Sequence, residues 1–239
     1  MDIKLEDEDP CNKKKPCERS SLLQVIERIR RYAAEALSKK RYEHSVRVAE
    51  TAKKMCVLYG VDPDLGYLAG IAHDICKEMK DEDILSLALQ DGDPVTGVEK
   101  DKLSLLHGRA AAVMLKKDFD VKDKELLQAV ACHTFGSPSL GKLGKIIYAA
   151  DKIEPGRGHV SAEYLDRLFS LDLDHLVKTV LSEAISYVKE KKYAVSPQSI
   201  AFLKKIEEDI AAENKIAAKK NNESVSASKG GGKLTAHYA

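Results

Sequence analysis

The sequence has no tryptophan, and aromatic residues make up only 5% of its 239 positions. This shortage argues against a surface on which nucleic-acid bases stack, because such surfaces are built from aromatic rings. Long apolar runs are missing too, since no stretch approaches the ~18 uninterrupted apolar residues of a membrane-spanning helix. An excess of charge is also missing: 39 basic residues against 38 acidic ones leave a net charge of +1. We therefore expect neither a nucleic-acid partner nor a membrane partner.

Targeting signals and a disulfide framework are not evident either. The N-terminal run MDIKLEDEDPCNKKKPCERS has no apolar segment of the kind found in secretory signals, so we expect a cytoplasmic location. The five cysteines are odd in number, and in a reducing compartment we expect them to be thiols. Cys11 and Cys17 are not spaced as a CxxC pair, which makes a zinc site there a poor interpretation.

The sequence does contain the apolar spacing of helices. Hydrophobic residues make up 44% of the chain, and they recur three or four positions apart, as at Leu22, Val25 and Ile29. Similar spacing predicts a helix over 62–76, with Asp62 as its N-cap. Strand-like alternation is missing, so we expect an all-α bundle of about nine or ten helices. The folded body should cover residues 20–212, between a flexible tail at 1–19 and a disordered tail at 213–239. The second tail is polar and rich in glycine and serine, and has too few large apolar groups to offset the entropy of ordering.

Two aspartates follow strongly apolar runs. Asp74 lies in LAGIAHDICK, directly after His73, and Asp151 lies in KIIYAADKIEPGR. A buried carboxylate without a partner costs several kcal/mol, and two of them repel unless a metal ion or a cationic side chain lies between them. Imidazoles combined with carboxylates suit a transition metal rather than calcium, which prefers oxygen ligands. Alone, the His73–Asp74 pair could equally be a hydrogen-bonded helix end.

A metal ion with two imidazole and two carboxylate ligands could catalyse hydrolysis. On a six-coordinate ion these ligands leave two positions for water and for a substrate oxygen. Such an ion lowers the pKa of water and polarises a phosphoryl group. The pattern therefore predicts metal-assisted hydrolysis of a phosphate ester or anhydride.

Five segments follow one another along the body: RYEHSVRVAETAKKM (41–55), LAGIAHDICKEM (68–79), LLHGRAAAVML (105–115), ACHTFG (131–136) and KIIYAADKIEPGR (145–157). In these segments the chain resembles the HD-domain phosphohydrolase superfamily and, within it, the YqeK family. The resemblance implies an HD-domain helical bundle and assigns His44, His73, Asp74 and Asp151 to the metal-ligand positions.

The YqeK resemblance also implies an activity. A member of that family is a symmetrical diadenosine tetraphosphate hydrolase that binds iron and releases two ADP, so the expected partner is a dinucleoside polyphosphate substrate. Manganese, cobalt and zinc stay open as alternatives to iron, because His/Asp sites accept several ions. Asp74 is expected to be the catalytic carboxylate as well, orienting or deprotonating the attacking water.

Substrate contacts are implied for five further residues, which the family places on the nucleotide phosphates: Lys77, His107, His133, Thr134 and Arg157. An arginine suits bidentate capture of phosphoryl oxygens. The histidine of the HG motif could instead cap its helix or bind a second metal ion, so the number of metal ions stays open.

The sequence departs from the family pattern in two places, and both leave base preference open. It contains HTFGSPS (133–139) where the family often shows HTTG and an arginine, and YAVSPQS (193–199) where the family shows an IHPDT-like run. A broader nucleotide phosphohydrolase or phosphodiesterase remains an alternative, as does a nucleotide-binding regulatory module without turnover. The oligomeric state is open, with a homodimer among the options.

Overall fold

The computed structural model describes residues 16–229, and it is all-α over that range, with no strand. The expectation of a helical HD-type bundle is confirmed: residues 16–229 form eleven α-helices, ten of them with eight or more residues. The elements, in order, are α1 (Pro16–Ala36), α2 (Lys39–Tyr59), α3 (Pro63–Ala72), α4 (Asp81–Ala88), η1 (Leu89–Asp91), α5 (Gly97–Asp101), η2 (Leu103–Leu106), α6 (His107–Asp118), α7 (Lys124–Cys132), α8 (Lys142–Ile153), α9 (Ala162–Phe169), α10 (Leu173–Glu190) and α11 (Pro197–Lys229).

Helix α3 begins where its sequence signals place it but ends earlier than expected. Asp62 is the N-cap, since its side chain accepts hydrogen bonds from the backbone N–H groups of Asp64 and Leu65. The apolar pattern predicts a helix over 62–76, whereas α3 ends at Ala72. Beyond it, the chain continues in tight turns with bonds such as Lys77 N–H to the Asp74 carbonyl. These turns carry His73 and Asp74 out of the helix.

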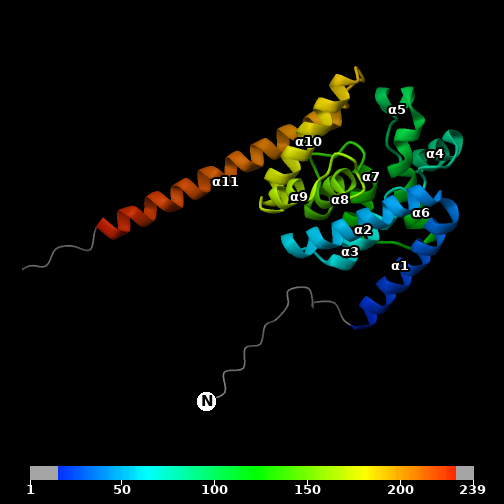
Figure 1. Ribbon diagram of the computed structural model, residues 1–239, viewed down its shortest axis with the longest axis horizontal. Coiled ribbons are helices and arrows are strands. Elements are labelled where there is room, and N and C mark those ends of the chain that lie inside the picture. The colour runs from blue at the N-terminus through cyan, green and yellow to red at the C-terminus, as the bar shows by residue number, and fades with distance from the viewer. Residues whose placement is uncertain (1–15, 230–239) are drawn as a thin grey trace, which may run out of the picture.

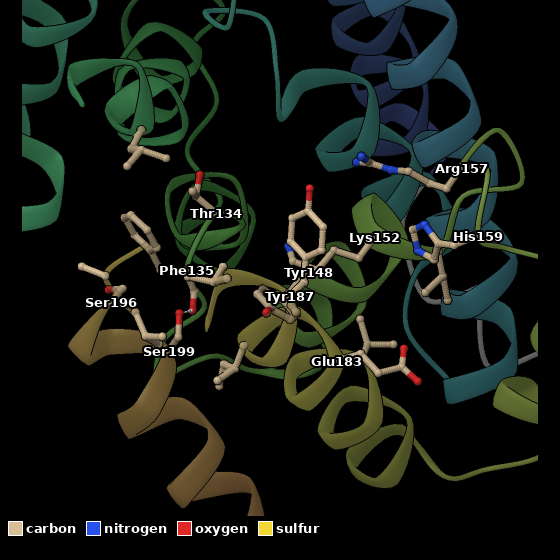
Figure 2. Close-up of a pocket in the computed structure, with 18 of the residues that line it drawn as sticks. Thr134, Phe135, Tyr148, Lys152, Arg157, His159, Glu183, Tyr187, Ser196 and Ser199 are labelled. Atoms are coloured by element: carbon tan, nitrogen blue, oxygen red, sulfur yellow. Dashed lines mark hydrogen bonds between the residues drawn. The ribbon is translucent and has the colours of Figure 1, made fainter. Parts of the chain in front are cut away.

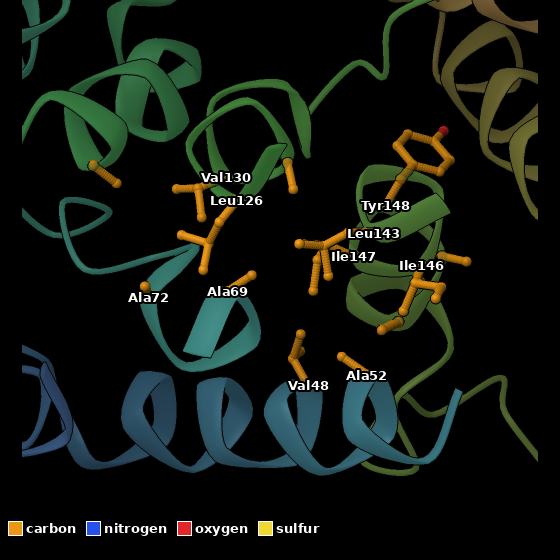
Figure 3. Close-up of a cluster of buried hydrophobic side chains, with 14 of the residues drawn as sticks. Val48, Ala52, Ala69, Ala72, Leu126, Val130, Leu143, Ile146, Ile147 and Tyr148 are labelled. Carbon is orange, nitrogen blue, oxygen red and sulfur yellow. The ribbon is translucent and has the colours of Figure 1, made fainter. Parts of the chain in front are cut away.

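The core lies where α2, α3, α7 and α8 meet (Figure 3). Figure 3 shows small and branched side chains from these helices, such as Val48, Ala69, Val130 and Ile147, turned toward one another. The pairing of α2 with α3 is especially close: a Cβ added at Gly70 would lie 2.5 Å from the Ala49 Cα. This approach matters because both helices carry side chains of the site described below.

The C-terminal helices complete the bundle (Figure 1). Helix α10 packs on α8, and the first half of α11 packs on α10. This half of α11 buries Phe202, Ile206 and Ile210, and the Phe202 ring lies against the Tyr148 ring of α8. The rest of α11 points away from the bundle and extends past the expected boundary at 212 to Lys229, with exposed side chains from Ala211 to Ile216. At the other end, α1 begins at Pro16, inside the expected tail.

Both expected tails fall partly on residues 1–15 and 230–239, which lie outside the described residues. The flexibility of 1–19 and the disorder of 213–239 therefore stay predictions. Across residues 16–229, we find no helix with the length and apolar character needed to cross a membrane.

Candidate metal centre

Three elements bring the four expected metal ligands together. His44 comes from α2, His73 and Asp74 from the turns after α3, and Asp151 from α8. The His44 Nε2 atom lies 3.2 Å from Asp151 Oδ1 and 3.8 Å from Asp74 Oδ2. The His73 Nε2 atom lies 3.5 Å from Asp74 Oδ2 and 3.7 Å from Asp151 Oδ1. Two imidazole nitrogens and two carboxylates thus face one point.

The outer ring nitrogens of these histidines are held by acceptors. His73 Nδ1 donates to the Gly70 carbonyl at 2.6 Å, and His44 Nδ1 contacts the Glu154 carboxylate at 3.1 Å. A donating Nδ1 leaves Nε2 with its lone pair free, the form in which imidazole binds a metal. Both Nε2 atoms are buried and lack a hydrogen-bond partner. Because unpaired buried polar atoms are costly, this donor set fits a bound cation.

Two further histidines continue the cluster. His107 and His133 donate from Nδ1 to the carbonyls of Ser104 and Val130, at 2.8 and 2.7 Å. Their Nε2 atoms lie 3.0 Å apart, and that of His107 is 2.9 Å from Asp74 Oδ1. Asp74 thus faces one histidine pair with each oxygen. Two groups have ligand atoms within 4.8 Å of one another, namely His44, His73 and Asp151, and His73, Asp74 and His133.

The charges inside the cluster are strongly coupled. Burial alone would raise the pKa of Asp74, but neighbouring His73 and the hydrogen bond from His107 hold that pKa well below its ordinary value. Burial likewise opposes ionisation of Asp151, and Lys152 and His44 outweigh it, so its pKa is also well below normal. Burial, together with His107 and His73, lowers the pKa of His133 well below normal. Burial also acts to lower the pKa of His73, but the carboxylates of Asp74 and Asp151 outweigh it and raise that pKa. The cluster therefore presents two ionised carboxylates, with His133 held neutral beside them.

Cationic side chains border the cluster at each carboxylate. At Asp74, Arg41 donates to Oδ2 at 2.8 Å, and Lys77 Nζ lies 3.3 Å from His107 Nδ1. At Asp151, Arg157 donates to Oδ1 at 2.7 Å and also to the backbone carbonyl of that residue. The structure thus places the expected phosphate-binding residues Lys77 and Arg157 beside the cluster, where they could meet an anionic substrate.

The HD domain family model matches residues 41–156, a range that contains all four expected ligands. The chain is 34% identical over 194 residues to the Staphylococcus aureus protein named symmetrical bis(5'-nucleosyl)-tetraphosphatase. The aligned region covers 80% of this chain and 90% of that protein. The chain belongs to the HD domain family.

Other comparisons agree with this HD domain assignment. A Bacillus subtilis protein of the same name is 27% identical to the chain, and the aligned region covers 68% of this chain and 87% of that protein. A Clostridium acetobutylicum structure described as a "predicted HD superfamily hydrolase involved in NAD metabolism" is 30% identical, with a TM-score of 0.71. It covers 77% of this chain and 97% of that one. With its His/Asp cluster, the chain is an HD-domain phosphohydrolase whose site could hold a metal ion.

Sequence reasoning missed one acid that supports this HD domain's site. Glu154 is 2% exposed, and its carboxylate contacts His44 Nδ1 and accepts a hydrogen bond from Arg47 at 2.5 Å. Burial would raise the pKa of Glu154, but the bonds from Arg47 and His44 lower it. The signal was its place three residues after Asp151, at the end of the same helix. Gly156 leaves room for this contact, since a Cβ there would meet the Arg47 guanidinium.

A cavity of about 670 Å³ opens next to the metal cluster (Figure 2). Three residues link the two: Arg157 and Lys152, which contact Asp151, and Thr134, which follows His133. The buried Thr134 Oγ1 has no hydrogen-bond partner, which leaves it available to a ligand. The cavity is lined by Leu105, Thr134, Phe135, Tyr148, Lys152, Ile153, Arg157, His159, Tyr164, Val180, Glu183, Ala184, Ile185, Tyr187, Val188, Ala194, Val195, Ser196 and Ser199.

Proposed function

We propose that the chain is a metal-dependent symmetrical bis(5'-nucleosyl)-tetraphosphatase that hydrolyses diadenosine tetraphosphate to two ADP. The observation that carries this proposal is the convergence of unpartnered imidazole nitrogens and ionised carboxylates beside a cavity that has Arg157 and Lys152 in its wall. Relatives that are 34%, 30% and 27% identical to the chain are named symmetrical bis(5'-nucleosyl)-tetraphosphatase, which supports the proposal. A volume near 670 Å³ lies within the range of roughly 300–1,000 Å³ typical of pockets for small organic ligands.

The metal ion would be held by His44, His73, Asp74 and Asp151, and we propose iron. A bound transition metal would lower the pKa of a water molecule and polarise a phosphoryl group. Nitrogen and oxygen donors accept manganese, cobalt and zinc as well as iron, so the choice of ion needs measurement. His107 and His133 face Asp74 and could hold a second ion or contact the phosphates.

The protein's own side chains would bind and orient the polyphosphate. Arg157 and Lys77 lie at the two carboxylates and would neutralise phosphoryl oxygens on either side of the bond that breaks. Thr134 would donate its unpartnered hydroxyl to a phosphate oxygen. Asp74 is proposed as the catalytic carboxylate that orients or deprotonates the attacking water, because it lies at the centre of the cluster and its lowered pKa keeps it an ionised hydrogen-bond acceptor.

Product analysis tests this proposal. Purified protein is incubated with diadenosine tetraphosphate, with and without prior chelation, and nucleotides are separated by chromatography. We expect ADP as the sole product, loss of turnover on chelation, and recovery with iron or manganese. AMP plus ATP would indicate an asymmetric phosphohydrolase, and tight binding without any product over long incubation would indicate a regulatory module. Either result contradicts the proposed activity.

A further inference from the structure

The cavity beside the metal cluster has charges of opposite sign in different parts of its wall. Its cationic part is formed by Arg157 and Lys152, whose charged atoms lie 2.7 and 3.5 Å from the Asp151 carboxylate. Its anionic residue is Glu183 from α10, which accepts a hydrogen bond from the Tyr164 hydroxyl. The hydrogen-bond partner of Glu183 is Tyr164 and not a residue of the metal cluster, and Figure 2 shows Glu183 well apart from Thr134.

This distribution of charge orients a nucleotide. Phosphate is attracted to Arg157 and Lys152 and repelled by the Glu183 carboxylate, so the phosphates should lie at the metal side. The opposite end of a nucleotide carries the ribose hydroxyls and base N–H groups, which are donors that a carboxylate accepts. Apolar wall residues such as Val180 and Ile185, with Tyr148, suit the flat faces of ribose and base. One nucleoside diphosphate unit therefore fits with its phosphates inward.

The cations at Asp74 have different surroundings. Arg41 and Lys77 approach the cluster on the side of Asp74 and His107, and neither lines the cavity. The Arg41 side chain is 32% exposed. These side chains offer charge to a second diphosphate unit, but they contribute no wall to the cavity that could enclose its nucleoside.

We propose, building on the proposed function, that the site reads the nucleoside at only one end of its substrate. A nucleoside 5'-tetraphosphate, which has a nucleoside at one end and a bare phosphate at the other, is then a second substrate class. Water adds its oxygen to phosphorus on one side of the central anhydride, and the bridging P–O bond breaks. The bridging oxygen leaves with the bonding electron pair and is charged or protonated according to pH. The products are nucleoside diphosphate and pyrophosphate.

The experiment compares adenosine 5'-tetraphosphate with diadenosine tetraphosphate on the full chain, using the same metal-loaded preparation. We expect the kcat/KM values of the two substrates to lie within about tenfold of each other. A nucleoside that the cavity does not bind adds no more binding free energy than about one net hydrogen bond. The expected products from adenosine 5'-tetraphosphate are ADP and pyrophosphate. Hydrolysis of the diadenosine compound with more than about tenfold slower turnover of the one-ended compound would overturn the inference and leave the proposed function standing. Hydrolysis of neither would contradict both.

A substitution at Glu183 tests whether the cavity binds the nucleoside. Glu183→Gln keeps shape and removes charge, so we expect KM to rise by the same factor, about tenfold, for both substrates with kcat retained. Inorganic tetraphosphate, which has no nucleoside, should show no such rise. The matched control is Glu190→Gln, an exposed residue at the end of the same helix that does not line the cavity. Unchanged KM in Glu183→Gln, or an equal rise with inorganic tetraphosphate, would overturn the inference.

Discussion

At the residue scale, the metal centre depends on how its histidines are held. His73, His107 and His133 each donate from Nδ1 to a carbonyl three residues earlier in the chain. This repeated contact turns all three Nε2 atoms toward the cluster, and at His73 it leaves Nε2 without a hydrogen-bond partner and available to a cation. The centre is therefore prepared by the backbone, and His44 differs because its Nδ1 contacts a carboxylate, that of Glu154.

The Glu154 contact leads to the first prediction. Glu154→Gln retains the size of the side chain but loses the charge that faces His44 Nδ1, so His44 becomes a weaker and less ordered ligand. We expect metal affinity to fall by roughly 10- to 100-fold, measured by competition with a chelator of known affinity. Glu163→Gln, an exposed glutamate in the first turn of α9, is the control. Equal affinity in both variants would contradict a positioning role for Glu154.

Sequence patterns found the ligand candidates but not the residues around them. His73, Asp74 and Asp151 were predictable because polar residues following apolar runs need partners, whereas His44 was assigned through the resemblance to the HD-domain superfamily. The structure places all four together. Their role as ligands stays a prediction. The structure also adds Glu154. Its place three residues after Asp151 puts it near the site, but this spacing does not show that its carboxylate contacts His44 of α2, 110 positions away in the chain.

At the element scale, the approach of α2 to α3 is set by a glycine. A Cβ at Gly70 would lie 2.5 Å from Ala49 Cα and 2.8 Å from its nitrogen, and these backbone atoms cannot rotate away. The same residue supplies the carbonyl that holds His73.

We therefore expect Gly70→Ala to lower the free energy of unfolding by about 1–3 kcal/mol, as overpacked cores do, and to weaken metal binding. Urea denaturation and chelator competition measure the two effects. Gly97→Ala serves as the control, since an added Cβ there meets nothing within 4 Å. Similar urea midpoints for both variants would show that α2 and α3 tolerate separation.

A second element-scale prediction concerns the segment between α4 and α6. Arg109 of α6 donates to both oxygens of Asp91 at 2.7 Å and to the Asp93 carbonyl. Burial would raise the pKa of Asp91, but the hydrogen bond from Arg109 lowers it. A depressed folded pKa stabilises the fold above the ordinary value of 3.8, and this stability is lost as pH falls through the folded value.

Asp91→Asn should therefore destabilise the protein by about 1–3 kcal/mol at pH 7. The deficit should begin to shrink below pH 3.8, where the Asp91 carboxyl of the unfolded chain takes up a proton, and it should be lost as the pH falls through the lower pKa of folded Asp91. Urea midpoints at pH 7 and pH 3 measure this. Asp101→Asn, exposed at the end of α5, should show little change at either pH. A deficit that stays constant with pH would rule out the ion pair as its source.

Helix ends show what sequence patterns at this scale could not predict. Apolar spacing predicts a helix over 62–76, yet α3 ends at Ala72. The physical reason lies in a side chain: His73 Nδ1 donates to the Gly70 carbonyl, the group that would otherwise accept the next helical hydrogen bond. Apolar periodicity reports which face is buried and does not report this competition.

At the scale of the whole molecule, the all-α class was predictable because apolar spacing and the lack of strand alternation agreed throughout the body. The extent of α11 was not, because helix propensity in a run such as AENKIAAKK does not reveal whether anything packs on it. The apolar contacts of α11 end near Ile210, and side chains from Ala211 to Ile216 are exposed.

We therefore expect a chain shortened to residues 1–212 to keep its thermal midpoint and its hydrolytic activity. Thermal melts and product assays of the shortened and full chains provide the comparison. Shortening to 1–199 instead removes Phe202 and Ile206, which are buried, and should unfold the protein or lower its midpoint strongly. Loss of activity in the 1–212 chain at an unchanged midpoint would show that the last helix contributes to function.

The central claim is that side chains distant in sequence share a bound metal ion, and metal content tests it most directly. Wild-type, His73→Ala and His175→Ala proteins are purified without chelators, and their iron, manganese, cobalt and zinc are quantified by elemental analysis. His175 is exposed and bonded to Asp172, away from the cluster, which makes it the matched control. We expect at least one metal ion per chain in the wild type and in His175→Ala, and little in His73→Ala. A full metal complement in His73→Ala, or a metal-free wild type that hydrolyses diadenosine tetraphosphate, would contradict the account.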